Sequence, residues 1–526
     1  MAAIPATAGE ERHEEFRDKE FRMDARYWWQ APLFLTDQEQ QQLKVIGVLI
    51  FEGYFGTDIS RMSPKEFDEL WNAIGHEKQE KATRLFAQYA TGKGFEIPGL
   101  PTPREEFIPP ADATYWWEFV DPEHREGAIN WAREEIPEML RSYWELAEWK
   151  GVELPIPRPE EVDVMRLTPE EHALIFTPPS FPLGRVPIEE WLNRVFPGAN
   201  IIAVFGRIPR YSGLAEWVDR LLKVDRTPLF PLQKSRIICT TGILAAGYIA
   251  VWLDCGVLTV EEAAAIAPKI YAMIAAKAEI VGVQDVPVVF VLESMKTVLA
   301  GTAKDPRDHL GTHLPLDQKF RPIPGGAQVK RGSRDATVGF AIRRRVWFLW
   351  DKDLTTTGHL GLLPVPVNTR VYQPTELAGN KVGTVADVAR HGFADVARVA
   401  TLDGDVIPYV RTMTFWTAPV TGWRDPIVPE WSGKFGRTTG RTSGNIYAVG
   451  IDTWNDAFGL LRNQIWATIR VELGDSGSPL FISGPGGGVA VTGITWGRLV
   501  ARPYMGLFSP VSGVRAELPG WEPHTK

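Results

Sequence analysis

The chain has 526 residues, of which 44% are hydrophobic and 11% aromatic. It is too apolar to be disordered throughout and long enough for about two to four domains. Its only cysteines, Cys239 and Cys255, precede residue 300, so no disulfide can stabilise the C-terminal part. The net charge of −8 is unevenly divided: residues 321–526 hold 23 Lys and Arg against 16 Asp and Glu, and the preceding part is acidic.

Residues 1–304 carry the signatures of helix starts, and we expect two mainly helical regions, 1–155 and 156–304, of unknown role. In a capping box, a Ser or Thr is followed three residues later by Glu, and each side chain satisfies a free backbone N–H. Apolar residues at steps of three or four between residues 129 and 147 predict a long helix that Gly151 stops. The capping boxes are Thr36/Glu39, Ser63/Glu66, Thr168/Glu171 and Thr259/Glu262.

No segment predicts export or membrane insertion. The first 22 residues, MAAIPATAGEERHEEFRDKEFR, are densely charged where a secretory signal needs an apolar run, so we expect a cytoplasmic protein. Residues 237–253 form a 17-residue run without formal charge, at the lower limit of a membrane span. Two threonines and two glycines reduce its apolarity, which favours a buried helix.

From about residue 320 the pattern changes to a β domain. Residues 305–319 are the predicted linker, and residues 320–526 the predicted domain. Within 465–472, alternate residues are apolar, as in a strand with one buried face. Short runs separated by Gly and Pro turns predict a sandwich or barrel rather than a parallel sheet. These runs are 338–342, 369–373, 446–451 and 489–496.

Residues 474–480, GDSGSPL, contain a candidate nucleophile, Ser476. A serine hydroxyl needs a neighbouring base and a third group that orients the base. The β domain offers three histidines: His359 after a turn of small residues, His391 in a polar loop as the alternative, and His524 near the end. A turn between strands, without chemistry, is the other interpretation of such a Gly-Ser segment.

Asp395 is the preferred orienting carboxylate because its neighbours are small or apolar, and a buried carboxylate needs a partner such as an imidazole N–H. Asp387, Asp403 and Asp405 lie in more polar surroundings and stay open as alternatives. Gly474 permits a turn in which its own N–H and that of Ser476 point to one spot, as an oxyanion hole requires.

Residues 320–526 resemble the trypsin/chymotrypsin-like serine peptidases, most of all their disulfide-poor bacterial branch. The resemblance rests on GDSGSPL with Gly493-Ile494-Thr495-Trp496-Gly497, on TTTGHL and FADVARVA, and on the segments 322–326, 433–444 and 508–511. The order His, Asp, Ser is that of chymotrypsin. The resemblance implies an all-β double barrel behind the mainly α region, with an active site between the barrels.

The resemblance also implies residue roles. His359 would be the general base, Asp395 its orienting group and Ser476 the nucleophile, with the N–H groups of Gly474 and Ser476 as the oxyanion hole. The strand of Thr495, Trp496 and Gly497 would bind substrate. Two departures are Thr357, where the family usually has Ala, and Pro324, which argues against activation by a freed Ile323 amine near Asp475.

We therefore expect a serine endopeptidase that acts on protein or peptide substrates without cofactor or metal, and expect no nucleic-acid or membrane partner. Arg470 and Arg498 favour an acidic substrate side chain if they are not simply solvated. The helical region would regulate, inhibit or recruit, with contact between the acidic region and the basic peptidase domain. The alternative is a catalytically silent pseudo-protease that serves as a binding scaffold.

Overall fold

The computed structural model divides into two compact units, one made of residues 1–107, 343–352 and 401–405 and the other of the remainder. The predicted capping boxes at Thr36 and Ser63, and nearly all of the predicted linker, lie outside the described residues. Apart from isolated positions, the structure describes residues 112–120, 122–176, 187–209, 213–299, 319–331, 334–346, 349–359, 366–374, 378–401, 406–412, 417–455, 459–484 and 488–526.

The long predicted helix is confirmed as α5 (Pro122–Lys150), which follows the short 3-10 helix η2 (Trp116–Phe119). Its periodic apolar residues form one buried face, and Gly151 after it adopts a left-handed backbone with φ of 64°. The next helix, α6 (Pro169–Phe176), begins with the predicted capping box: the backbone N–H of Glu171 donates to Thr168 Oγ1, and that of Thr168 to the Glu171 carboxylate.

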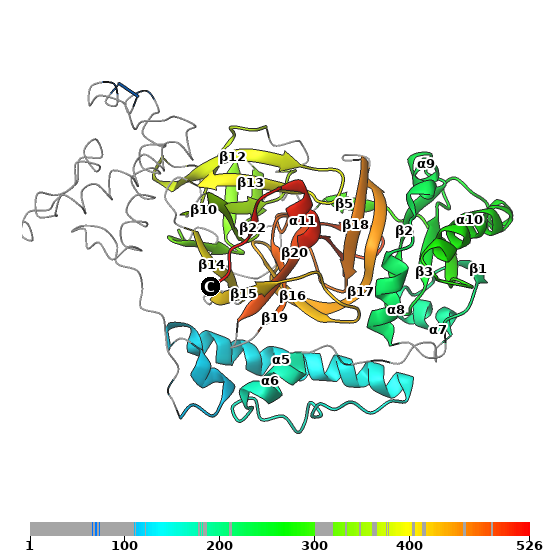
Figure 1. Ribbon diagram of the computed structural model, residues 1–526, viewed down its shortest axis with the longest axis horizontal. Helices are drawn as coiled ribbons and strands as arrows, with labels where there is room; N and C mark the ends of the chain where they lie inside the picture. The colour runs from blue at the N-terminus through cyan, green and yellow to red at the C-terminus, as the bar shows by residue number, and fades with distance from the viewer. Residues whose placement is uncertain are drawn as a thin grey trace, which may run out of the picture. The chain divides into compact units, whose positions relative to one another are not determined.

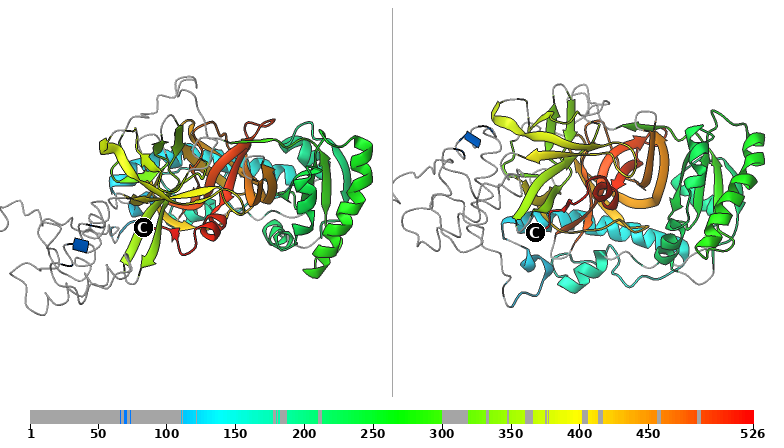
Figure 2. Two further views of the ribbon diagram at one scale, coloured as in Figure 1. Left: turned by 90° about the horizontal axis from the view of Figure 1, so that it is seen from above. Right: turned by 45° about the horizontal axis from the view of Figure 1, so that its top comes forward.

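Helix α5 is held against strands of the C-terminal domain (Figures 1 and 2). Glu135, 7% exposed, accepts hydrogen bonds from Arg441 at 2.6 Å, Ser443 at 3.1 Å and the Trp431 indole at 3.0 Å. About two turns further on, the Tyr143 hydroxyl accepts the backbone N–H of Trp431 at 3.0 Å. The acidic region thus contacts the basic one through a buried ion pair.

Residues 188–299 form a mixed α/β region rather than a purely helical one. Its helices are α7 (Ile188–Val195), α8 (Leu214–Leu222), α9 (Phe230–Lys234) and α10 (Val260–Ile280), with the 3-10 helix η3 (Thr227–Leu229). Its strands are β1 (Ile201–Phe205), β2 (Ile238–Leu244), β3 (Ile249–Leu253), β4 (Val288–Leu292) and β5 (Thr297–Leu299). The predicted capping box of Thr259 and Glu262 is confirmed at the start of α10.

The helix predicted for residues 237–253 is wrong, because this run forms the antiparallel hairpin of β2 and β3. Both strands are nearly fully buried, so both faces are apolar and no period of two appears in the sequence. Gly247, with φ of 87°, lies in the turn between the strands. Within the described part of the chain, no helix is long and apolar enough to cross a membrane.

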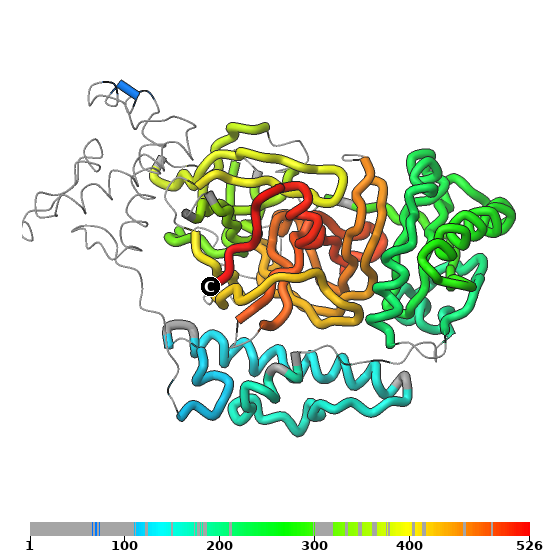
Figure 3. Tube along the Cα trace, in the orientation of Figure 1, coloured from blue at the N-terminus to red at the C-terminus, as the bar shows by residue number. Residues whose placement is uncertain are grey.

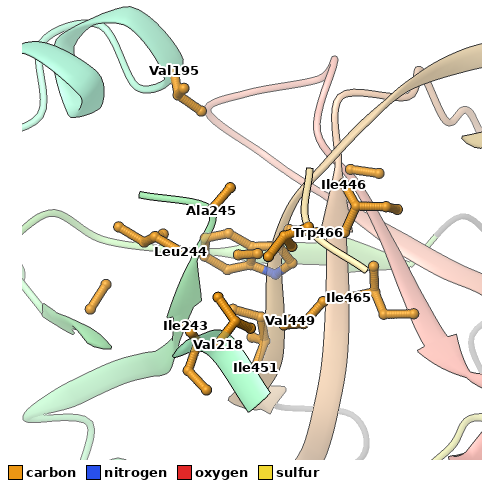
Figure 4. Close-up of a cluster of buried hydrophobic side chains, with 14 of the residues drawn as sticks. Val195, Val218, Ile243, Leu244, Ala245, Ile446, Val449, Ile451, Ile465 and Trp466 are labelled. Atoms are coloured by element: carbon orange, nitrogen blue, oxygen red, sulfur yellow. The ribbon is translucent and has the colours of Figure 1, made fainter. Parts of the chain in front are cut away.

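Strand β2 also pairs with β17 (Gly440–Asn455), which extends a C-terminal sheet into the α/β region (Figure 3). Apolar side chains from both parts fill one core at this junction, including Ile243, Leu244, Ile451 and Trp466 (Figure 4). The Trp466 ring lies 4.9 Å from that of Trp252. The two regions therefore share a core rather than merely touching.

Six C-terminal strands close a ring in the order β16-β17-β18-β21-β20-β19, each pairing with the next and β19 with β16. The predicted strands at 446–451 and 489–496 are confirmed within β17 and β20. The strands are β16 (Trp431–Gly436), β18 (Gly459–Ala467), β19 (Pro479–Ser483), β20 (Val489–Leu499) and β21 (Gly506–Pro510). Helix α11 (Val511–Glu517) packs on β20 and β21.

A second sheet of eight strands has the order β22-β9-β10-β13-β12-β11-β7-β8 and lines a separate apolar core. Three further strands extend the first sheet: β6 (Ile323–Gly325), β14 (Val406–Arg411) and β15 (Thr417–Trp423). The strands of the eight-stranded sheet are β7 (Gln328–Arg331), β8 (Arg334–Thr337), β9 (Ala341–Val346), β10 (Leu349–Thr356), β11 (Arg370–Tyr372), β12 (Lys381–Ala389), β13 (Val396–Thr401) and β22 (Glu522–Pro523).

Candidate active site

His359 and Asp395 lie at adjacent ends of two paired strands. His359 follows β10, and Asp395 immediately precedes β13. The two strands are antiparallel with Thr356 opposite Ala397, so the residues just beyond these positions come together. Ser476 lies in the loop before β19, in the six-stranded ring, so the three side chains come from two different sheets.

The three side chains form one hydrogen-bonded chain. His359 Nε2 lies 2.8 Å from Ser476 Oγ, and His359 Nδ1 lies 2.5 Å from Asp395 Oδ2. All three residues are fully buried. A proton on Nδ1 satisfies the carboxylate and leaves Nε2 as the acceptor for the serine hydroxyl. The structure thus brings together the three residues that the sequence selected.

The alternatives that the sequence left open lie elsewhere or outside the described residues. His391 is exposed, and the backbone N–H of His524 donates to Ala341 O beside β22. Asp387 pairs with Arg398 at 2.5 Å. Asp403 and Asp405 are not among the described residues.

Gly358 and Thr357, the two residues that directly precede His359, both lie against the Asp395 carboxylate. A Cβ added to Gly358 would lie 2.4 Å from Ala389 O and 3.0 Å from Asp395 Oδ1, so only glycine fits there. The Thr357 hydroxyl donates to Asp395 Oδ2 at 2.5 Å and lies 2.6 Å from His359 Nδ1. The sequence analysis named Thr357 only as a departure from the family pattern and missed this contact.

The loop around Ser476 presents backbone donors. Gly474 and Gly477 have φ of 99° and 90°, which side chains rarely allow. The N–H of Asp475 donates to Glu472 O, whereas the N–H groups of Gly474 and Ser476 have no backbone acceptor among the described residues. This leaves two donors for an incoming oxygen, as an oxyanion hole requires.

Thr337, at the end of β8, holds this loop in place. Its backbone N–H donates to Ser476 O at 2.8 Å and its hydroxyl to Gly474 O at 2.9 Å. The N–H groups of Gly474 and Ser476 share their peptide planes with Leu473 O and Asp475 O, which accept the Thr438 hydroxyl at 2.7 Å and the N–H of Ser478 at 2.9 Å. Because these carbonyls are held on one side, the two N–H groups face the other. Nothing in the sequence around Thr337 indicated this role, since the contact spans 137 residues.

Asp475 is buried and holds the loop through a salt bridge with Lys434, at 2.9 Å, in which both side chains are fully buried. Burial alone would raise the pKa of Asp475, but the Lys434 ammonium and the Thr439 hydroxyl hold it below its ordinary value. Ile323 lies within β6, which pairs in parallel with β14. An internal lysine, rather than a freed Ile323 amine, thus neutralises Asp475.

The candidate substrate-binding strand is β20, which contains Thr495, Trp496 and Gly497. Thr495 is bonded internally: its N–H donates to Ser478 O, and its carbonyl accepts the N–H of Gly477. From Gly497 onward, the edge of β20 is paired antiparallel with β5, with Leu299 opposite Gly497 and Thr297 opposite Leu499. A segment of the N-terminal region therefore occupies this edge.

The two candidate specificity arginines face the same carboxylate. Arg470 lies 3.3 Å and Arg498 3.6 Å from oxygens of Glu472. Their charge is thus partly neutralised, which weakens the expectation of a preference for acidic side chains. In the described part of the chain, no three His, Cys, Asp or Glu side chains are arranged to hold a metal.

The strands of residues 320–526 belong to two mostly antiparallel sheets, and the candidate site joins side chains from both. A closed ring of six strands beside a second sheet of eight strands agrees with the predicted all-β domain. No protein-family model and no curated protein matches the chain.

Solved structures of bacterial trypsin/chymotrypsin-like serine proteases are similar to the C-terminal part of this chain. Protease A of Thermobifida fusca is 22% identical, with a TM-score of 0.31, over 39% of this chain and 99% of that one. The chymotrypsin of Cellulomonas bogoriensis is 23% identical, with a TM-score of 0.30, over 39% and 99%. A glutamic acid specific serine protease is 20% identical, with a TM-score of 0.32, over 38% and 100%.

Proposed function

We propose that the chain is a serine endopeptidase whose N-terminal region inhibits it. The observation that carries the first part is the continuous hydrogen-bonded chain from Asp395 through His359 to Ser476, at 2.5 and 2.8 Å. Ser476 lies between the His359 Nε2 that can take its proton and two backbone N–H groups that have no backbone acceptor among the described residues. It therefore has a base on one side and donors for a developing oxyanion on the other.

In the first step, Ser476 Oγ attacks the substrate carbonyl carbon while its proton passes to His359 Nε2. The carbonyl oxygen takes up negative charge, which the N–H groups of Gly474 and Ser476 stabilise. Asp395 accepts the Nδ1–H hydrogen bond and stabilises the imidazolium. The imidazolium then protonates the leaving amine, and the C–N bond breaks to leave an acyl ester on Ser476.

The second step reverses these roles with water. His359 takes a proton from the water as its oxygen attacks the acyl carbon. The imidazolium returns that proton to Ser476 Oγ as the ester bond breaks, which releases a carboxylic acid and restores the site. No group other than the three side chains and the two backbone donors is needed.

Inhibition is supported by the pairing of β5 with β20. An extended substrate would add a strand to the edge of β20, and β5 already takes up this edge at Gly497, Arg498 and Leu499. Side-chain contacts fix β5: Asn455 donates to Thr297 Oγ1 at 2.9 Å, and Leu299 is buried. With His359 and Ser476 also fully buried, a substrate has no access in this form.

The experiment uses a variant in which β5 is loosened, Thr297→Ala with Leu299→Asp, called the released chain below. Thr297→Ala removes the Asn455 bond, and Leu299→Asp places a charge in an apolar contact. We expect a fluorophosphonate probe to label the released chain at Ser476, and the released chain to cleave a denatured protein substrate. Adding Ser476→Ala or His359→Ala should abolish both.

A pseudo-protease scaffold gives a different result. In that case the released chain is folded, as judged by circular dichroism, but is labelled no faster than its Ser476→Ala form. That outcome would sink the peptidase proposal and favour the scaffold. Mass spectrometry of the labelled peptide identifies the modified residue, so labelling at another serine counts against the proposal as well.

A further inference from the structure

We propose that the Thr357 hydroxyl positions His359 and fixes which ring nitrogen carries the proton; this rests on the proposed function. Three atoms form a closed triangle: Thr357 Oγ1 to Asp395 Oδ2 is 2.5 Å, Thr357 Oγ1 to His359 Nδ1 is 2.6 Å, and Nδ1 to Oδ2 is 2.5 Å. All three residues are fully buried, so water does not compete for these contacts.

Counting protons in the triangle assigns each contact. The hydroxyl has one proton, and the ionised carboxylate can only accept, so this proton goes to Asp395 Oδ2. Towards Nδ1 the hydroxyl then presents a lone pair. His359 Nδ1 thus faces two acceptors and must carry the ring proton, which leaves Nε2 unprotonated beside Ser476 Oγ.

Neighbouring hydroxyls do not duplicate this role. Thr495 Oγ1 bonds to Ser478, and the Ser509 hydroxyl donates to Gln464 while accepting the N–H of Asp395. Among the described residues, Thr357 is the one side-chain hydroxyl that donates to the Asp395 carboxylate, and Asp395 Oδ1 has no hydrogen-bond partner.

Thr355, Thr356 and Thr357 follow one another in the chain, but only the Thr357 hydroxyl bonds to Asp395. The Thr355 hydroxyl bonds the backbone of Phe340, and the Thr356 hydroxyl donates to Thr337 O. Only the third member, Thr357, lies past the end of β10 and turns towards the site. Thr355 is therefore a matched control: its buried hydroxyl lies two residues before Thr357 and bonds the backbone instead of the carboxylate.

The first test measures labelling rates of Ser476 in the released chain. Thr357→Val keeps the shape and removes the hydroxyl, and we expect labelling to slow about tenfold or more, as for the loss of a hydrogen bond to a charged group. Thr357→Ser keeps the hydroxyl and should restore the rate to within about threefold. Thr355→Val should leave the rate unchanged. Equal rates for Thr357→Val and Thr357→Ser would overturn the proposal.

The second test does not depend on activity. In the full chain with Ser476→Ala, the Nδ1 proton of His359 should give a far-downfield proton resonance, identified by its loss in His359→Ala. We expect Thr357→Ser to retain it and Thr357→Val to shift it upfield and speed its exchange with water. An unchanged resonance in Thr357→Val refutes the positioning role. If the released chain is never labelled but this shift occurs, the peptidase proposal fails and the positioning role stands.

Discussion

Asp475 shows how single residues outside the proposed reaction shape the site. Besides the Lys434 ammonium, it accepts the Thr439 hydroxyl and the backbone N–H groups of Thr438 and Glu472. These bonds orient the residue directly before Ser476, and with it the N–H groups on either side. A buried charge with this many partners is stable only while all of them remain.

Lys434→Met tests this pair. It leaves the Asp475 carboxylate buried without its counter-charge, so we expect a loss of about 3–5 kcal/mol in the free energy of unfolding, measured by urea denaturation. The pKa of Asp475 in the folded parent chain lies below its ordinary value of 3.8, so the pair stabilises the parent above that pH. The loss should therefore shrink as the pH falls below about 3.8. Lys434→Arg, which keeps the charge, should lose less at neutral pH; equal losses would show that the ion pair is not the cause.

At the scale of elements, β5 is a strand of only three residues. The inhibition proposed for it depends on its pairing with β20 from Gly497 to Leu499. Its neighbours also bind the barrel: the N–H of Val500 donates to Lys296 O at 2.9 Å, and Arg502 pairs with Glu293 at 2.7 Å. These contacts flank the strand on one side. Two strands cannot pair with one edge of β20 at the same time, so the proposed function predicts that substrate and β5 compete.

We therefore expect the released chain to be labelled by fluorophosphonate at least about tenfold faster than the parent, since each 1.4 kcal/mol removed from docking changes the open population tenfold. Ile280→Asp serves as the control, because Ile280 at the end of α10 is 75% exposed and belongs to no strand. Parent and released chains with the same rate would show that β5 does not block the site.

At the scale of the whole molecule, residues 188–299 and the C-terminal barrel share one sheet and one core. Strand β17 pairs with β2 on one side and with β16 and β18 within the barrel. Two large rings from the α/β region, Phe196 and Trp252, pack on Trp466 at 6.1 and 4.9 Å. Removal of the α/β region would expose this ring and the edge of β17.

The fragment 320–526 tests this sharing. We expect it to unfold at least about 2 kcal/mol more easily than the fragment 188–526 and to bind a hydrophobic dye, because the aromatic surface around Trp466 becomes exposed. Urea denaturation and dye fluorescence measure the two effects. If both fragments are equally stable and neither binds the dye, the shared core does not contribute to the stability of the C-terminal barrel. Added salt should change the difference in unfolding free energy between the two fragments only a little, because the ion pair of Arg226 and Asp452 across this junction is buried.

The sequence by itself was enough where local patterns carry the information. The apolar spacing in α5, the capping boxes of α6 and α10, and the short runs within β17 and β20 were all visible because each depends on residues a few positions apart. The alternation at residues 465–472 coincides with a strand only at its start, because β18 ends at Ala467. The selection of His359, Asp395 and Ser476 needed a further step, namely the motif order that the family resemblance supplied.

Only the tertiary structure decided what depends on contacts between distant residues. The sequence of residues 237–253 fits a buried helix and a buried hairpin equally well, because both are apolar on all sides. The pairing of β2 with β17 decides for the hairpin. Likewise, the closeness of Thr357 to Asp395, of Lys434 to Asp475 and of Leu299 to Gly497 spans 38, 41 and 198 positions. Such contacts follow from strand register, which local sequence does not encode.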